Sequence, residues 1–357
     1  MYKRQSIDYA TDDGSTSAVA VPCNVATGLA LDRCDFTKAL GTLSFAAGET
    51  EKSFKILIND DAYTEGPEIV TLRLSNPSGG AVLGSRAAAV LTINDDAPES
   101  SSNPIDDEES FVRQHYHDFL NREPDADGLH FWTSEIDSCG ADQQCREAKR
   151  VNVSAAFFFS IEFQETGGLV YRMHKAAYGD IPGKPVPVTL NEFLPDTQAI
   201  SRDVIVGQLG WEQRLAANKD AYAAEFVTRT RFTAAFPATM TAAEFVDALN
   251  VNAHGALSTS ERNALVNDLT NGTKTRAQVL RAVAEDQTLK DAELRKAFVL
   301  MQYFGYLRRN PDDAPDVNFD GYNFWLAKLN QFNGNFVEAE MVKAFITSAE
   351  YRRRFGQ

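Results

Sequence analysis

The sequence predicts a two-part chain, β then α: a β-sandwich followed by an all-α helical repeat bundle. Three observations lead to this prediction. Residues 6–96 contain short alternating runs separated by Gly, Pro and Asn, a pattern typical of a sandwich. After residue 110, apolar side chains recur with the period of a helix. The helical part also contains segments that resemble one another, which indicates one supersecondary unit stacked on its like.

Five strands are expected in the first part. They are Ile7–Ala10, Thr42–Phe45, Phe54–Ile58, Ile69–Leu74 and Ala89–Ile93. A spacing of two residues predicts that the third and fourth strands turn alternate side chains inward. These inward candidates are Phe54, Ile56, Ile58, Val70, Leu72 and Leu74.

An acidic turn joins the third and fourth strands. Residues 59–68 read Asn-Asp-Asp-Ala-Tyr-Thr-Glu-Gly-Pro-Glu and place four carboxylates within nine residues. Two carboxylates about 4 Å apart repel by roughly 4 kcal/mol at an effective dielectric near 20. When a hard cation binds between the carboxylates, the interaction energy of the cluster becomes favourable. Ca²⁺ suits a flexible loop better than Mg²⁺. A merely solvated turn is the alternative, but further acids at matching strand ends, Asp35 and Asp95-Asp96, favour an ion site.

Further motifs surround this turn and carry a resemblance. They are Asp8-Tyr9-Ala10-Thr11-Asp12-Asp13-Gly14, Asp35-Phe36, Gly41-Thr42-Leu43-Ser44-Phe45, Gly48-Glu49-Thr50, Leu74-Ser75-Asn76-Pro77 and Thr92-Ile93-Asn94-Asp95-Asp96. Together with the acidic turn, they resemble the Calx-beta domain, an immunoglobulin-like sandwich of sodium/calcium exchangers and secreted bacterial proteins. The resemblance implies calcium at one end of the sandwich. The implied ligands are Asp35, Asp60, Asp61, Glu65, Glu68, Asp95 and Asp96, with the Tyr63 carbonyl as an extra ligand.

The chain departs from that family in two places. Family members begin with additional strands, the first of which usually supplies another glutamate ligand. The sandwich is therefore expected to be incomplete at one edge, with a weaker hold on calcium. An insert, Ser17–Arg33, also replaces a shorter loop and brings Cys23.

The helical part contains two clear copies of one pattern. Residues 122–125 and 309–312 both read Arg-x-Pro-Asp, and each is followed by Gly-x-x-Phe-Trp. These copies resemble the bacterial family called domain of unknown function 4214, whose name implies no activity. We therefore expect a sandwich at 1–97, a linker at 98–109 and an all-α region at 110–357, with repeats at about 110–165, 225–290 and 295–357. The helices should form one packed body in which Trp132 and Trp325 occupy equivalent core positions.

The composition limits the possible classes of binding partner and the cellular compartments in which the protein is expected. A net charge of −15 argues against nucleic acid, and no apolar run is long enough for a membrane span. The cysteines form two close pairs, Cys23/Cys34 and Cys139/Cys145, which favour disulfides of an oxidising compartment over free thiols. The first residues do not resemble a signal peptide, so we expect a piece of a longer secreted protein or a misplaced start.

Catalytic motifs are missing from the sequence. It contains no Gly-x-Ser-x-Gly, His-Glu-x-x-His or phosphate loop. The leading interpretation is a non-enzymatic extracellular or cell-surface structural or interaction protein, with calcium in the sandwich and an unknown protein or surface polymer as partner. The alternative is the C-terminal accessory tail of a larger secreted enzyme.

Three other clusters are weaker candidates. Residues 316–321 open like an EF-hand loop, but the twelfth position is Ala327, so helix capping by Asp320 is favoured. His115 and His117 cannot point to one side of a helix, which disfavours a metal site. The basic side chains at 352–354 are expected to lie at a helix C-terminus and to interact favourably with the negative end of its dipole.

Overall fold

The computed structural model describes residues 5–12, 22–95 and 102–356. Its contacts divide the chain into two compact units. Unit 1 comprises Met1–Phe157, Phe304–Arg308 and Phe336–Gln357, and unit 2 comprises Phe158–Tyr303 and Arg309–Asn335. The predicted single helical body is therefore wrong, because the first helices and the C-terminal end pack into the same unit as the β region.

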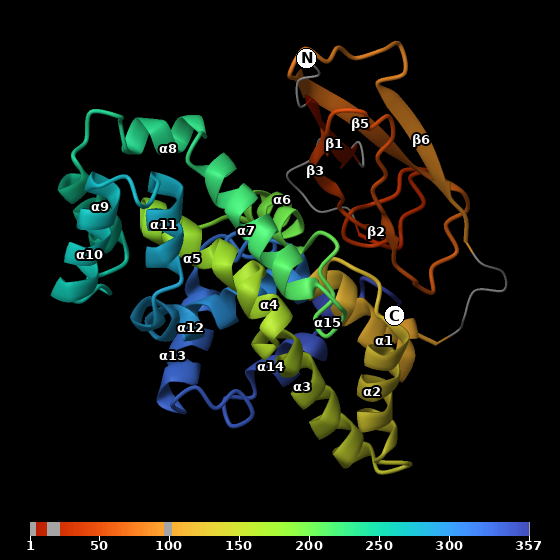
Figure 1. Cartoon of the computed structure of the whole chain (residues 1–357). Coiled ribbons are helices and arrows are strands. Elements are labelled where there is room, and N and C mark those ends of the chain that lie inside the picture. The colour runs from red at the N-terminus through yellow and green to blue at the C-terminus, as the bar shows by residue number, and fades with distance from the viewer. Residues whose placement is uncertain (1–4, 13–21, 96–101, 357) are drawn as a thin grey trace. The chain divides into compact units, whose positions relative to one another are not determined.

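The β region of unit 1 has two sheets (Figure 1). Its strands are β1 (Gln5–Asp12), β2 (Phe36–Thr37), β3 (Leu40–Phe45), β4 (Leu57–Ile58), β5 (Glu68–Ser78) and β6 (Ala88–Ile93). The larger sheet has the order β3-β1-β5-β6, with antiparallel neighbours, and β2 pairs with β4. This arrangement confirms the predicted β-then-α fold class.

The sandwich core lies between the two sheets. Phe36 of β2 and Val70 of β5 are fully buried in one cluster, and Tyr9 of β1 stacks on Phe54 with ring centroids 4.1 Å apart. Ile58 lies opposite the buried Phe36 across β2 and β4, so it belongs to the predicted inner face, but it is 41% exposed. The exposure arises at the edge of the sandwich, where Ile56 and Ile58 line the same hollow, whereas Leu57, on the other face of β4, is buried.

Unit 1 continues with helices from both ends of the all-α region. They are η1 (Pro104–Asp106), α1 (Glu108–His115), the π-helical η2 (Tyr116–Leu120), α2 (Ala126–Asp137), most of α3 (Gln143–Phe159), part of the π-helical η3 (Gln302–Leu307), α14 (Met341–Ile346) and α15 (Ala349–Arg352). Five side chains of α1 and η2 follow a helical period and are all buried: Phe111, Val112, Tyr116, Phe119 and Leu120.

The described part of the predicted linker is packed against protein. Ile105 is buried in η1, and the buried Asn103 donates from Nδ2 to the Arg352 carbonyl at 3.0 Å. The connection between the β region and α1 is thus fixed to the C-terminal end of the chain.

Unit 2 is all helical. Its helices are α4 (Ile161–Glu165), α5 (Gly167–Tyr178), α6 (Leu190–Ser201), α7 (Trp211–Phe226), α8 (Thr230–Ala235), α9 (Ala242–Asn252), α10 (Thr259–Thr270), α11 (Arg276–Ala284), α12 (Gln287–Met301) and α13 (Asp320–Gln331). Helix α5 is central, because every residue from Gly167 to Ala177 is buried. Phe245 and Leu249 of α9, within the predicted middle repeat, are also fully buried.

The two outer repeats share a local geometry. In the first, the Tyr116 hydroxyl lies so close to Gly128 that a Cβ there would clash with it. In the last, the Tyr303 hydroxyl would lie 2.7 Å from a Cβ on Gly321. The arginine of each Arg-x-Pro-Asp motif lies over the ring of that tyrosine. The glycine of the sequence pattern is therefore required by close approach of the tyrosine.

The Phe-Trp pairs of the repeats lie at the surface. Phe131 and Phe324 are 54% and 57% exposed, and each makes an edge-to-face contact with the half-buried tryptophan that follows it. Trp132 and Trp325 occupy equivalent positions but are not fully buried core residues. On each face the aliphatic residue four positions later, Ile136 or Leu329, is fully buried, as is Tyr322 three positions before Trp325.

Both predicted disulfides are present. Cys23 pairs with Cys34 and Cys139 with Cys145, each with Cα atoms 5.6 Å apart. Among the described residues, no helix combines the length and apolar character needed to cross a membrane.

Candidate metal centre at the loop end of the sandwich

The predicted ligands come together at one end of the sandwich. A cavity of about 210 Å³ lies there, between the segment after the Cys23–Cys34 disulfide, the acidic turn and the end of β6. Seven of the eight predicted ligand residues line it, namely Asp35, Asp60, Asp61, Tyr63, Glu65, Glu68 and Asp95. The eighth, Asp96, lies outside the described residues.

Three carboxylates form the centre of this cavity. Asp35, Glu65 and Glu68 each offer an oxygen, and these three oxygens lie within 4.8 Å of one another. Asp35 and Glu68 are only 5% and 4% exposed. Asp35 precedes β2, whereas Glu68 opens β5, so strands from both sheets bring the acids together.

Burial and crowding perturb the two buried carboxyls. Desolvation is the largest cause that raises the pKa of Asp35 to about 8, and the nearby charges of Glu68 and Asp95 act in the same direction. Burial likewise raises the pKa of Glu68 to about 6, with the charges of Glu65, Asp61 and Asp95 adding to it. A hydrogen bond joins Asp35 to Glu68, so the two groups share a proton near neutral pH.

Backbone groups orient the remaining acids. One carboxylate oxygen of Asp95 accepts hydrogen bonds from the N–H groups of Glu65 and Gly66, at 2.9 and 2.7 Å. Asp61 accepts the N–H of Tyr63 at 2.8 Å. Gly66 has φ of +79°, a conformation that favours glycine and lets the turn place its N–H toward Asp95. The loop is thus folded around its carboxylates.

The donor set suits a hard cation. The residues that line the cavity offer carboxylate, amide and carbonyl oxygens, and none of them is a cysteine or histidine. Ca²⁺ takes six to eight oxygen ligands in flexible geometry, whereas Zn²⁺ sites are built from cysteine and histidine as well as carboxylates. The chemistry of the donors therefore fits calcium.

Sequence reasoning missed Asn59, the residue that begins the acidic turn. Its buried amide donates from Nδ2 to the Cys34 carbonyl at 3.0 Å, and its Oδ1 lies 3.1 Å from Nδ1 of His117. Asparagine is common in turns, so its presence gave no signal of a contact 58 residues away.

The weaker clusters have structural roles. His115 lies with one ring nitrogen 2.7 Å from the Phe111 carbonyl and the other 2.8 Å from the Ser154 hydroxyl. In the EF-hand-like stretch, Asp316 pairs with Arg309, and the Asn318 side chain accepts the Asp320 N–H. The contacts of these side chains are with protein groups.

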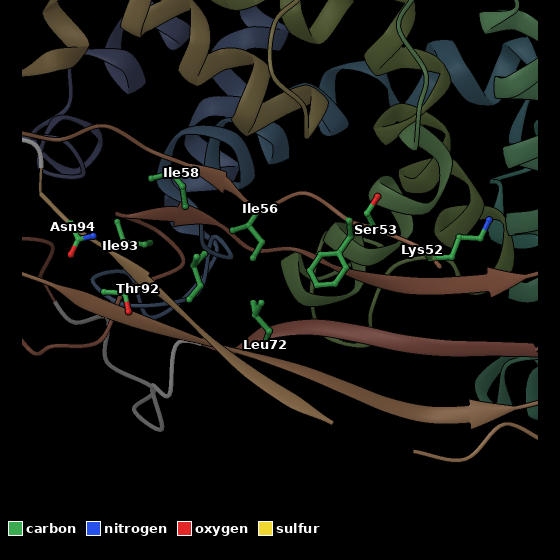
Figure 2. Close-up of a pocket in the computed structure, with 10 residues that line it drawn as sticks. Lys52, Ser53, Ile56, Ile58, Leu72, Thr92, Ile93 and Asn94 are labelled. Atoms are coloured by element: carbon green, nitrogen blue, oxygen red, sulfur yellow. The ribbon is translucent and has the colours of Figure 1, made fainter. Parts of the chain in front are cut away.

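A second hollow opens beside the metal centre. It has a volume of about 700 Å³ and is lined mainly by apolar side chains of the 52–58 segment, β5 and β6. Figure 2 shows Ile56 and Leu72 facing one another across this space, with Ile58 and Ile93 toward one end. Residues 51–56 form no strand, although the sequence predicted one at 54–58, and this edge of the sandwich is open in the described part of the smaller sheet.

Two family models match the chain in succession. The Calx-beta domain model matches residues 8–97, the part that holds the acidic cavity. Residues 8–97 are a Calx-beta domain. The model of the domain of unknown function DUF4214 then matches residues 92–167, which include the first Gly-x-x-Phe-Trp copy.

The following similar proteins each match about a quarter of this chain. The sodium/calcium exchanger Calx of Drosophila melanogaster is 35% identical over 91 residues, which is 26% of this chain and 8% of the exchanger. Two crystal structures are also similar. One is the calcium binding domain CBD12 of CALX1.1, with 34% identity, 27% of this chain and 34% of that chain covered, and a TM-score of 0.21. The other is the apo-form Calx CBD1 domain, which is 31% identical. The match covers 26% of this chain and 71% of that chain, with a TM-score of 0.21. The chain thus spans a small part of the exchanger.

Proposed function

We propose that this protein is a non-enzymatic extracellular or cell-surface interaction protein whose Calx-beta domain binds Ca²⁺. The carrying observation is the single cavity lined by seven predicted oxygen-donor residues, with Asp35 and Glu68 buried and holding raised pKa values. Such crowding is unfavourable without a counter-charge, and a divalent cation supplies one. The matches to the Calx-beta domain model and to a sodium/calcium exchanger support this assignment.

The extracellular assignment is supported by both disulfides. Disulfides persist in oxidising compartments, and short loops closed by them are typical of secreted domains. The non-enzymatic assignment is supported by the roles of the histidines that the sequence singled out. His115 is fully buried against protein groups, which hold the pKa of its ring low, at about 4, chiefly through desolvation.

The proposed partner is a protein or a surface polymer. Supporting this, both outer repeats expose the phenylalanine of their Phe-Trp pair, at 54% and 57%. Exposed aromatic pairs offer a rigid apolar surface of the kind enriched in interfaces. In this proposal the sandwich is stiffened by calcium, while the helical repeats present the binding surface.

A calcium titration of the full chain tests the metal assignment. Isothermal calorimetry should give a Kd on the order of 10⁻⁴ to 10⁻³ M, the range of extracellular modules. At 100 times that Kd, the ion should stabilise the domain by about 2.7 kcal/mol. Mg²⁺ should compete poorly, because it demands near-octahedral geometry and keeps its water.

The matched variants are two adjacent-acid pairs. Asp60→Asn/Asp61→Asn replaces two carboxylates of the cavity by neutral amides, whereas Asp312→Asn/Asp313→Asn removes an equal charge from unit 2. The first variant should lose the calcium response and the second should keep it. Equal responses in both variants, or none in the wild type, would overturn the proposed metal site.

A further inference from the structure

The acidic turn is hydrogen-bonded to the other end of the chain. We define residues 352–356 as the C-terminal segment, which follows and overlaps α15. The Ala62 N–H donates to the Phe355 carbonyl at 2.8 Å, and the Tyr63 hydroxyl donates to the Arg353 carbonyl at 3.2 Å. Both contacts lie within unit 1. The turn that carries four candidate carboxylate ligands is thus attached to residues about 290 positions away.

The same turn is held on its other side by η2. Asn59 precedes Asp60, and its Oδ1 lies 3.1 Å from Nδ1 of the buried His117. The other ring nitrogen of His117 lies 2.9 Å from a carboxylate oxygen of Glu123. This chain of contacts connects the start of the turn to the first Arg-x-Pro-Asp motif.

Arg354 joins three parts of unit 1. Its guanidinium forms a two-pronged ion pair with Asp118, at 2.9 and 3.0 Å, and also donates to the Tyr306 carbonyl at 2.9 Å. Its Nε donates to the Arg33 carbonyl at 2.9 Å. Arg354 is 1% exposed, so these partners replace water entirely. The sequence had assigned this basic run only to a helix dipole.

Three attachment points on the β region lie next to candidate ligands. Arg33 is two residues before Asp35, and the other attachment points, Asn59 and Ala62, flank Asp60-Asp61. We propose that calcium binding in the Calx-beta domain is coupled to docking of the C-terminal segment, with Arg354 as the central positioning residue. This inference rests on the proposed calcium site and adds its regulation.

The physical reason is preorganisation. Repulsion between the carboxylates favours an open turn, and the attachment points oppose that opening before the ion arrives. By linkage, the ion must then stabilise the docked segment by the same factor by which docking strengthens ion binding. Coupling between sites is typically about 5- to 150-fold.

Hydrogen exchange of the full chain provides a readout apart from binding. The amides of residues 353–356 donate to carbonyls of α15, so their exchange reports fraying of this end of the chain. Saturating Ca²⁺ should slow that exchange by at least about fivefold, the lower end of typical coupling. Helices α9 and α10, which belong to unit 2, serve as the internal control and should not respond.

Three variants separate docking from other effects. Arg354→Met should weaken the Ca²⁺ Kd measured by calorimetry by at least about fivefold and abolish the protection of the segment. Arg352→Met is the matched control, because Arg352 pairs with the exposed Asp106 instead of the sandwich, and its Kd should stay within about twofold of wild type. Tyr63→Phe keeps the candidate carbonyl ligand and removes one attachment, so it should weaken Kd in the same direction by less.

The outcomes distinguish this inference from the calcium site itself. Ca²⁺ binding by the wild type with no slowing of exchange in the C-terminal segment would overturn the coupling and leave the proposed function standing. Equal Kd values for Arg354→Met and Arg352→Met would do the same. No Ca²⁺ binding at all would overturn both. If Arg354→Met fails to fold, wild-type exchange and the Tyr63→Phe Kd decide the question.

Discussion

Raising the pH without calcium should destabilise the Calx-beta domain. Burial raises the pKa of Asp35 from 3.8 to about 8, and that of Glu68 from 4.5 to about 6. A carboxyl with a raised folded-state pKa binds its proton more tightly in the folded protein than in the unfolded chain. Its stabilising effect is complete below the unfolded pKa and is lost as the pH rises through the folded pKa.

The expected loss follows from the Asp35 pKa. One pKa unit corresponds to about 1.4 kcal/mol, so the three units between pH 5 and pH 8 correspond to a loss of about 4 kcal/mol. Glu68 acts in the same direction over the lower part of this window. The loss is a large fraction of the roughly 5 to 15 kcal/mol that stabilises a domain. Saturating calcium should remove it, because the ion binds the ionised carboxylates.

Urea unfolding at pH 5 and pH 8 measures this effect. Samples equilibrated with a chelator or with calcium are pulse-labelled at one fixed pH, and exchange is followed in β5 peptides. Peptides from α5 in unit 2 provide the internal control. The unfolding midpoint of β5 should fall between pH 5 and pH 8 in the chelated sample only.

Asp35→Asn is the diagnostic variant. The amide can still accept the Leu31 N–H and donate to Glu68, but it cannot ionise. The variant should lose most of the pH dependence and should be more stable than the wild type at pH 8 without calcium. A wild-type midpoint that stays level or rises from pH 5 to pH 8 would refute this reasoning, as would an undiminished pH slope in the variant.

Four other predictions concern packing and covalent links. Arg354→Met should lower the free energy of unfolding by about 3 to 5 kcal/mol, because it leaves a buried carboxylate unpaired. Arg352→Met should lower it by at most about 1 kcal/mol. Similar urea midpoints for the two variants would contradict this prediction. Gly128→Ala should cost about 1 to 3 kcal/mol, and Tyr116→Phe should partly restore the loss, since the clash involves the tyrosine hydroxyl; absence of rescue would count against the clash. Because the indole of Trp132 is half-buried, Trp132→Ala should lower the free energy of unfolding by less than the loss of about 3 to 5 kcal/mol that is typical of a buried aromatic side chain. Unhindered acrylamide quenching of its fluorescence would argue against any packing role. Reduction of each disulfide should cost about 2 to 3 kcal/mol, and an unchanged melting temperature in reductant would exclude that contribution.

Local patterns were sufficient to locate the β region and most of its acidic site. The alternation around Val70 and the turn residues after Ile58 are properties of short segments, so they can be read without knowing distant contacts. Asp35 and Asp95 were recognised because each stands at a strand end, and strand ends on one side of a sandwich necessarily meet. The repeats were likewise visible because each Gly-x-x-Phe-Trp copy is a local unit.

The tertiary structure decided which of the side chains predicted to face inward are actually buried. Ile58 fits a period of two and lies opposite the buried Phe36, but the hollow at this edge of the sandwich leaves it 41% exposed. Trp132 fits the face of its helix, yet the surface covered by neighbouring helices ends before the indole is fully enclosed. Burial depends on what packs against a face, and periodicity states only which residues share that face.

Long-range polar contacts were beyond any sequence pattern. Arg354 lies in a short basic run that looks like an ordinary helix end, and its partners Arg33 and Asp118 are 321 and 236 residues away. The contact of Asn59 with His117 likewise joins a common turn residue to a histidine that no sequence pattern links to the acidic turn. A hydrogen bond requires two groups within about 3 Å, and only the folding of unit 1 brings these groups to that distance. The sequence by itself therefore determined which residues form the acidic site, and the tertiary structure alone decided that the end of the chain is attached to it.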